Sequence, residues 1–526
     1  MRHEPTLGLG AVPLAALAST DAAAAELQTA LAGNLQPLLL PSQPQGLLSQ
    51  LIAAGFFDPI GADRKIREWR EGGPAALQAA PARRALEAVI PSLIARLAGF
   101  ADPDTALTTL DEIIGRLPVD ITQSAALETW PWLIASLVDL LGHAPVLARH
   151  LVVYPALVRR LIDGSAYASL PSPEDLDAEF ARLLDDGDSA KFAQAINGYR
   201  FTLGLQLLEG SGDALDLARS NCDLAEAGLR AIAGDVLARI KETHGEVPEA
   251  KLVILALGRF GGRSLTSSSD LDIIYLFTGN GSGQSDGRKP LDANEYFSRV
   301  AQQITTAMAA VTPLGPLYEV DTRLRPWGVK GMLACSIETY RRYHDENAWT
   351  WEHMALTRAR PVYGSRAARG EVKTIIDQRL RAPRDRAALL HDAVKMRGDI
   401  ARHKPARGTF DVKLVDGGLV DLEFAVHVNQ LAEHVGIGPR LGAAIRAQVS
   451  AGLADSAVID GHQVLSRMLI VLRLLSPGGQ EPAPEQRGVI AQACGFDDWR
   501  ALTDAYAEAR DAVRQTWQRA IGQPGE

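Results

Sequence analysis

Two aspartates, Asp270 and Asp272, stand two positions apart where a Ser-rich stretch meets the apolar run 271–277. The run is rich in β-branched and aromatic residues and is predicted to be a strand, so both carboxylates point to the same face. Like charges this close are costly unless a cation compensates them. Hard oxygen ligands favour Mg²⁺ or Mn²⁺, which also bridge phosphate oxygens. The pair therefore predicts a metal site at which two ions stabilise the attacking and leaving oxygens of an in-line displacement.

A third carboxylate is predicted to join this pair. The segment 317–325 is predicted to be a strand whose alternation places Glu319, Asp321, Arg323 and Arg325 on one face. Four charges on one face need partners. If this face meets the first two aspartates, Asp321 is a third metal ligand, and the two arginines neutralise a phosphate or the neighbouring carboxylates. The alternative is a salt bridge between Asp321 and one of these arginines, and such structural pairing explains the arginines equally well.

Glycines, hydroxyls and a lysine supply further candidates for binding a nucleotide. Gly261 and Gly262 lack Cβ atoms, so we expect their backbone N–H groups to approach a phosphate. Ser269, directly before the first aspartate, adds a hydroxyl donor. Lys413 precedes a Gly-Gly turn and is predicted to reach a phosphate, with a surface lysine as the alternative.

Other residues that often carry chemistry are given ordinary structural roles. His344 and His391 each precede an aspartate, but no spacing typical of a metal phosphohydrolase surrounds them, so both are predicted to lie on helix surfaces. Trp349, Trp351 and Met354 have the spacing of one helix face and are predicted to pack in a core.

Composition narrows the class of protein. The chain has 526 residues, a net charge of −9 and a pI of about 5.7, which disfavours a nucleic-acid substrate. Its three cysteines are far apart, which fits a reducing cytoplasm and no disulfide framework or zinc site. No apolar run is long enough to span a bilayer, so no membrane partner is expected.

Periodicity predicts a mostly α chain with a small α/β core. Helical patterns are predicted at about 178–208 and 213–243, ahead of strands at 251–257, 271–277 and 317–325. The Gly- and Ser-rich segment 278–290 is predicted to be a mobile surface loop. Helices are predicted again to the C-terminus, with one interruption at 409–420.

The motifs together resemble the glutamine synthetase adenylyltransferases of bacterial nitrogen control. Five stretches carry the resemblance in order, over about 170 residues: Gly258–Gly262, Ser268–Asp272, Val320–Pro326, Ala348–Arg360, and Lys413 with Gly417–Phe424. Spaced motifs in order are more specific than any single one. One departure is Ser264, where the family often has Glu, and it leaves the metal carboxylates intact.

The resemblance implies a polymerase-β-like nucleotidyltransferase core with helical domains on either side. It implies that Asp270 and Asp272 bind both metal ions and that Asp321 binds the catalytic one. ATP would be the substrate, and AMP would pass to a tyrosine of glutamine synthetase. The family also implies the PII signal protein as a partner and a cytoplasmic location.

Composition and helical periodicity predict how the chain is divided. Residues 1–45 are predicted to be loosely ordered, 46–165 a helical domain, 166–365 the nucleotidyltransferase domain with a helical lead-in, and 366–526 a C-terminal helical bundle. Family members resemble two such units in tandem, one deadenylylating and one adenylylating. This chain has one, which looks like the C-terminal adenylylating half, either as a fragment or as a single-unit form.

Three alternatives remain open from the sequence. The same core running in reverse would remove AMP by phosphorolysis. A uridylyltransferase acting on PII shares the core but carries further domains that the sequence does not show. A non-catalytic module that binds glutamine synthetase is disfavoured by the intact carboxylates.

Overall fold

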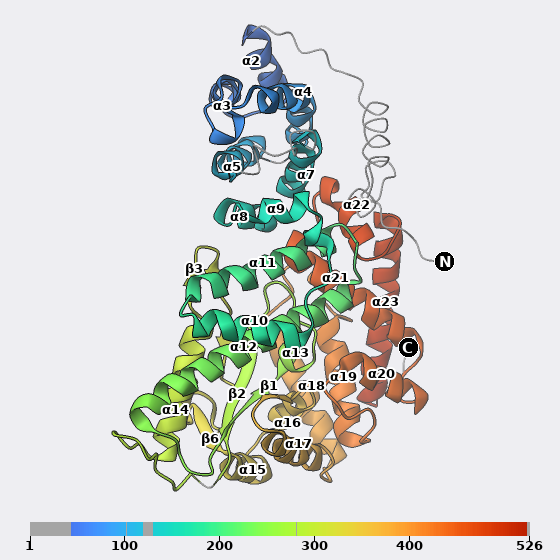
Figure 1. Cartoon of the computed structure of the whole chain (residues 1–526). Helices are drawn as coiled ribbons and strands as arrows, with labels where there is room; N and C mark the ends of the chain where they lie inside the picture. The colour runs from blue at the N-terminus through green and yellow to red at the C-terminus, as the bar shows by residue number, and fades with distance from the viewer. Residues whose placement is uncertain (1–43, 101, 119–129, 280, 523–526) are drawn as a thin grey trace. The chain divides into compact units, whose positions relative to one another are not determined.

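The computed structural model describes residues 44–100, 102–118, 130–279 and 281–522, and it is mostly helical with a small mixed sheet (Figure 1). The predicted fold class, mostly α with a small α/β core, is confirmed at this level. The segment predicted to be loosely ordered, 1–45, lies outside the described residues except for its last two positions, which begin α2 (Pro44–Ala53). No described helix combines the length and the apolar character needed to cross a membrane.

The chain forms two compact units, and the first is helical. It comprises residues 1–170, 197–213 and 482–499. Its helices before residue 165 are α3 (Pro59–Glu71), α4 (Ala80–Leu97), α5 (Pro103–Arg116), α7 (Trp130–His143), α8 (Pro145–Val153) and α9 (Leu157–Ile162). Asp58 and Asp102 cap α3 and α5 by accepting a backbone N–H each, which satisfies donors that a helix start leaves open. Trp69 is fully buried in this unit.

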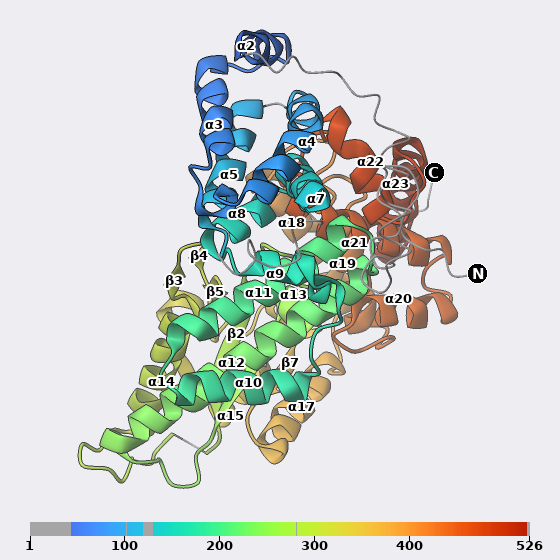
Figure 2. The same ribbon diagram turned by 45° about the horizontal axis from the view of Figure 1, so that its top comes forward.

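The second unit comprises residues 171–196, 214–481 and 500–526. The helix predicted at 178–208 is in fact two helices, α10 (Pro173–Asp185) and α11 (Ser189–Leu208). The break follows from Gly187, whose φ of 73° lies in the left-handed region that ends helices. The predicted helix at 213–243 is α12 (Ala214–His244), which lies beside α10 (Figure 2).

A five-stranded sheet forms the α/β core of this unit. Its order is β5-β2-β1-β7, and β6 also pairs with β2. The strands predicted at 251–257 and 271–277 are confirmed as β1 (Leu252–Ala256) and β2 (Leu271–Phe277), which run antiparallel. β7 (Arg360–Tyr363) pairs antiparallel with β1, while β5 (Val320–Asp321) and β6 (Ala334–Ser336) pair parallel with β2.

Helices cover both faces of the sheet, which explains why β1 and β2 are almost continuously apolar. On one face, Phe277 stacks on Phe297 of α14 (Ala293–Met308) with ring centroids 4.5 Å apart. On the other face, Leu255 and Ile274 join a cluster that includes Tyr340 of α15 (Ile337–Glu346). The remaining elements are the hairpin β3 (Val311–Thr312) and β4 (Gly315–Pro316), then α16 (Thr350–Leu356), α17 (Arg366–Leu380), α18 (Arg386–His403), α19 (Leu419–Ala432), α20 (Leu441–Ser450), α21 (Ala457–Leu475), α22 (Pro484–Ala493) and α23 (Trp499–Ala520).

The third predicted strand, 317–325, is correct only at Val320–Asp321, which form β5. β5 ends at Asp321 because the Asp321 carboxylate accepts the backbone N–H of Arg323 at 2.8 Å and turns the chain. The backbone N–H of Arg325 then donates to the carbonyl of Thr322. The two arginines therefore do not continue a strand face. The interruption predicted at 409–420 lies between α18 and α19, as expected.

Candidate active site

Three aspartates meet at the edge of the sheet. The parallel pairing of β2 with β5 places Asp272 opposite Asp321, and the backbone N–H of Leu271 donates to the carbonyl of Glu319 at 2.8 Å. Carboxylate oxygens of Asp270, Asp272 and Asp321 all lie within 4.8 Å of one another. The structure thus brings together the three residues that the sequence nominated as metal ligands.

The charges in this cluster act on one another. Burial, then Asp270 and Asp321, raise the pKa of Asp272 to about 6, because a third negative charge is costly here. Arg323 lowers the pKa of Asp321 by hydrogen bonding to it, with Nε 2.8 Å from Oδ2. The salt bridge that was the alternative to metal binding is therefore present, although the Arg323 side chain is 74% exposed. The donor set of three hard carboxylates with one raised pKa fits a divalent cation.

Two other residues predicted to contact a nucleotide form hydrogen bonds with nearby backbone groups. Arg325 donates to the carbonyls of Thr322 at 2.9 Å and Gly331 at 3.3 Å, so its guanidinium braces the loop after β5. The Ser269 hydroxyl accepts the backbone N–H of Thr266 at 3.0 Å and closes the turn before Asp270. Both side chains hold the backbone that carries the carboxylates.

The glycine loop has a structural role of its own. It contains the short helix α13 (Gly258–Gly261), in which the N–H groups of Gly261 and Gly262 donate to the carbonyls of Leu257 and Gly258 at 2.7 and 3.0 Å. These N–H groups therefore donate within the helix, and contact of Gly261 and Gly262 with a phosphate stays a prediction. A Cβ at either position would collide with Arg358, so the glycines allow that residue to pack closely.

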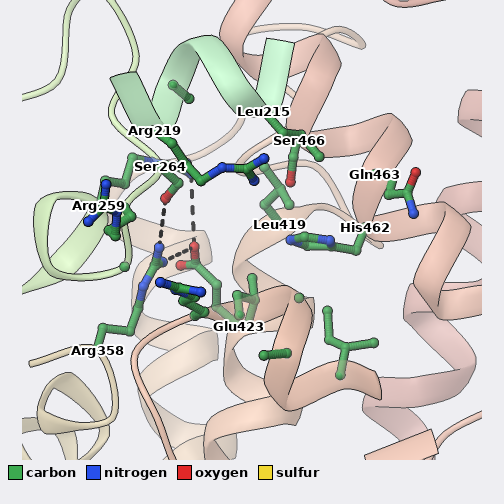
Figure 3. A pocket seen from close by; sticks show the side chains of 18 of the residues that line it. Leu215, Arg219, Arg259, Ser264, Arg358, Leu419, Glu423, His462, Gln463 and Ser466 are labelled. Carbon is green, nitrogen blue, oxygen red and sulfur yellow. Dashed lines mark hydrogen bonds and ion pairs between the residues drawn. The ribbon is translucent and has the colours of Figure 1, made fainter. Parts of the chain in front are cut away.

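A cavity of about 480 Å³ lies next to this loop (Figure 3). Residues from α12, the glycine loop, α19, α20 and α21 line it. Its charged lining consists of six arginines and a single carboxylate: Arg219, Arg259, Arg263, Arg358, Arg440, Arg446 and Glu423. Leucine and isoleucine side chains form other parts of the wall. A cavity of this size with a large cationic excess suits an anionic small molecule that also has an apolar part.

Arg358 and Glu423 form the centre of the cavity's polar network. Arg358 is 6% exposed and donates to Glu423 at 2.6 Å and to the Ser264 hydroxyl at 2.9 Å, as the dashed lines of Figure 3 show. Arg259 Nη2 lies 3.9 Å from Glu423. Burial raises the pKa of Glu423, but Arg358, Arg259 and Lys413 outweigh it and lower that pKa to about 2.

Two guanidinium nitrogens in this network are buried without a hydrogen-bond partner in the described part of the chain: Arg358 Nε and Arg259 Nη2. Buried polar atoms are normally paired, so these donors point to a missing acceptor. Sequence reasoning did not assign either arginine, although both lie in stretches that carry the family resemblance. Their convergence depends on packing between segments about a hundred residues apart, which no local pattern reveals.

Lys413 is partly buried rather than a free surface lysine. Burial lowers its pKa, as does Arg259, while Glu423 and Asp270 act in the opposite direction. Its charge also lowers the pKa of Asp272. Lys413 therefore stands in the electrostatic field of both the carboxylates and the cavity, and its contact with a nucleotide stays a prediction.

The predicted burial is wrong for three residues outside the site: His344, Trp349 and Trp351. His344 is 3% exposed, not on a helix surface, and burial, then His353 and Arg379, lower its pKa to about 3. Trp349 and Trp351 are 70% and 40% exposed, whereas Met354 is buried as predicted. The reason is that α16 begins only at Thr350, so one tryptophan precedes the helix and the other lies in its first turn.

Comparison with known proteins shows what this chain is similar to. Residues 134–374 match the family model described as glutamate-ammonia ligase adenylyltransferase. The chain is 34% identical over 494 residues to the bifunctional glutamine synthetase adenylyltransferase/adenylyl-removing enzyme of Brucella suis, a match covering 91% of this chain and 50% of the relative. Over most of its length, this chain is similar to one half of these adenylyltransferases. Enzymes of the same description from Xanthobacter autotrophicus and Rhizobium meliloti are 34% and 32% identical over 494 and 495 residues, each covering 90% of the chain and 50% of the relative.

The chain spans about half the length of the curated adenylyltransferases it matches. A second model, described as GlnD PII-uridylyltransferase, matches residues 393–521. The adenylyltransferase match includes the three aspartates and Arg358, and the second match includes Lys413 and Glu423. The cavity is therefore built by residues from both matched segments.

Proposed function

We propose that this chain transfers AMP from ATP to a tyrosine of glutamine synthetase. The observation that carries the proposal is the meeting of Asp270, Asp272 and Asp321 within 4.8 Å of one another, close enough to a cationic cavity for their charges to interact. The names of the relatives supply the acceptor, since they act on glutamine synthetase. The core would be of the polymerase-β type, and the chain would correspond to the adenylylating half.

The three aspartates would hold Mg²⁺ or Mn²⁺. When bound, the ions would neutralise phosphate charge and stabilise the attacking and leaving oxygens. Asp321 would act as a metal ligand. A role as acceptor of the tyrosine proton is disfavoured, because its lowered pKa makes Asp321 a weak base. Arg323 favours the ionised form of this carboxylate, and its exposed guanidinium would bind an incoming phosphate.

The cavity would take the nucleotide. The free donors Arg259 Nη2 and Arg358 Nε would bind phosphate oxygens, which removes the cost of leaving them unpaired. The apolar wall, which includes Leu215 and Leu419, offers a surface for the base. Lys413 would add a further cation to the same region. This places the main phosphate-binding role on the cavity arginines instead of Arg325, Gly261 and Gly262.

The test is to incubate the chain with glutamine synthetase, Mg²⁺ and ATP labelled at the α-phosphate. We expect a labelled tyrosine, and we expect Asp272→Asn to lower the rate at least about a hundredfold because a metal ligand is lost. Glu319→Gln is the matched control, since this exposed carboxylate lies two residues before Asp321 but outside the cluster.

Two results would reject the proposal. Label release from adenylylated glutamine synthetase with phosphate, without any transfer from ATP, would assign the chain to phosphorolysis. An Asp272→Asn variant as active as the wild type would show that the carboxylates are not catalytic. Because residues 393–521 match a model named for an enzyme of PII, we also propose the PII signal protein as a partner.

A further inference from the structure

Large apolar side chains are exposed in the segment that follows the third aspartate. Of the eleven exposed large hydrophobic residues in the described part of the chain, five lie between positions 327 and 351. We call them the tryptophan surface: Trp327, Val329, Met332, Trp349 and Trp351, with 50%, 73%, 54%, 70% and 40% exposure. Such clustering on a soluble protein marks an interaction site more often than scattered exposure does.

A buried pair of polar side chains holds the two halves of this surface together. The Trp327 ring packs against Tyr343 with centroids 4.8 Å apart, and the Trp327 backbone N–H bonds to the Tyr343 hydroxyl. That hydroxyl donates to Glu352 at 2.7 Å, and the other oxygen of Glu352 accepts the backbone N–H of Trp349 at 2.9 Å. The structure thus fixes the backbone on both sides while the indoles remain exposed.

The backbone of Trp327 carries strain that supports this interpretation. Its φ of 61° is a left-handed conformation that bulky residues rarely adopt. A glycine would fit there more easily, so the fold keeps an exposed tryptophan where it is unfavourable locally. Such a conformation persists only where the surrounding structure holds it, so the backbone of Trp327 is fixed by its neighbours.

One segment of the tryptophan surface, with Trp327 and Val329, lies in the loop that follows Asp321 of the carboxylate cluster. The loop from residue 322 to 331 starts at Asp321, and Arg325 bonds to the carbonyls of Thr322 and Gly331 at its two ends. The backbone N–H of Gly328 also donates to the backbone carbonyl of Arg325 at 2.8 Å, which closes a turn within the loop. Residues 322–337 include three cations and no acidic residue. The loop therefore presents apolar and positive groups beside the site of transfer.

We propose that the tryptophan surface docks the protein acceptor of the transferred AMP. This inference rests on the proposed function, in which a protein hydroxyl must reach the carboxylate cluster and its neighbouring residues must contact the surface around Asp321. Exposed tryptophans commonly dominate the binding energy of protein interfaces. The positive loop fits an acceptor segment that has apolar and acidic residues near the modified hydroxyl.

The test compares the wild type with a Trp349→Ala/Trp351→Ala double variant and with Met332→Gln, which disturbs the surface from its other segment without adding a charge. The readouts are the KM for glutamine synthetase, the KM for ATP, and the direct affinity for glutamine synthetase without ATP. We expect the KM for glutamine synthetase to rise, and the direct affinity for glutamine synthetase to fall, by about tenfold or more. The KM for ATP should not change. Phe57→Ala is the control, because Phe57 is 78% exposed in the other unit.

The outcomes separate the two proposals. If the wild type transfers AMP and both variants keep its acceptor KM and affinity, the docking inference is overturned while the proposed function stands. If the wild type binds the acceptor but transfers nothing, the proposed function fails, and weaker binding by the variants still supports the surface. All substituted side chains are exposed, so urea denaturation should give wild-type stability for each variant.

Discussion

Replacing Glu423 with glutamine removes the carboxylate that holds Arg358 in the cavity. Glu423 is 19% exposed on its side chain, and its oxygen lies 2.6 Å from Arg358 and 3.9 Å from Arg259. The variant keeps the size of the side chain but leaves two guanidinium groups without their counter-charge. Breaking a buried pair in this way typically costs about 3–5 kcal/mol.

The pKa of Glu423 gives a second measure of the same cost. Its fall from 4.5 to about 2 corresponds to about 3 kcal/mol of stability at pH 7, at about 1.4 kcal/mol per unit. A lowered carboxyl pKa contributes stability that is complete above the ordinary value and is lost as pH falls toward the folded value. The difference between wild type and variant should therefore be full at pH 7, begin to shrink near pH 4.5, and fall below half by pH 3.

Urea denaturation of both proteins at pH 7 and pH 3 measures this difference. Glu295→Gln is the control, since the Glu295–Arg299 pair on α14 is exposed and should contribute less than about 0.5 kcal/mol. A loss below 1 kcal/mol at pH 7, or a loss of equal size at both pH values, would refute the reasoning that Glu423 is the ionised anchor of Arg358.

Two further substitutions test the backbone around the cluster and around the tryptophan surface. Gly258→Ala places a Cβ against the Asp272 carboxylate at a φ of 53°, so we expect the free energy of unfolding in urea to fall by about 1–3 kcal/mol and AMP transfer to slow. Gly370→Ala in α17 is the control, because nothing lies within 4 Å of the added Cβ and the variant should not be destabilised. Equal effects of the two substitutions would contradict this reasoning. Tyr343→Phe removes a donor to Glu352, which is 5% exposed, so unfolding in urea should require about 1–3 kcal/mol less; a change under about 0.5 kcal/mol would show that the bond is unimportant.

The parts of the fold that the sequence predicted well are those with a strong local signal. β1 and β2 are continuous apolar runs because helices cover both faces, and their bounds follow the predicted segments closely. The meeting of Asp321 with Asp270 and Asp272 was expected from charge, since like carboxylates need a shared cation. What failed was the length of β5, because the Asp321 carboxylate competes with the sheet for the next backbone donor.

The cavity could not be predicted in the same way. Arg259, Arg358 and Glu423 come from the glycine loop, the segment after α16 and α19, and only tertiary packing brings them together. His344 was misplaced for a related reason, since a dipeptide of histidine and aspartate does not indicate which face of α15 is covered. Charge in a sequence predicts that partners are needed, but it does not identify them.

The contacts of Arg358 limit where this chain can be divided. Its guanidinium donates to both Ser264 of the glycine loop and Glu423 of α19. These two partners lie in segments of the chain that match two different family models. A truncation that ends with the first matched segment would remove α19, and with it both the counter-ion of Arg358 and part of the cavity wall that covers it. Chimeras made from relatives should therefore exchange the sheet and the following helices as one inseparable piece.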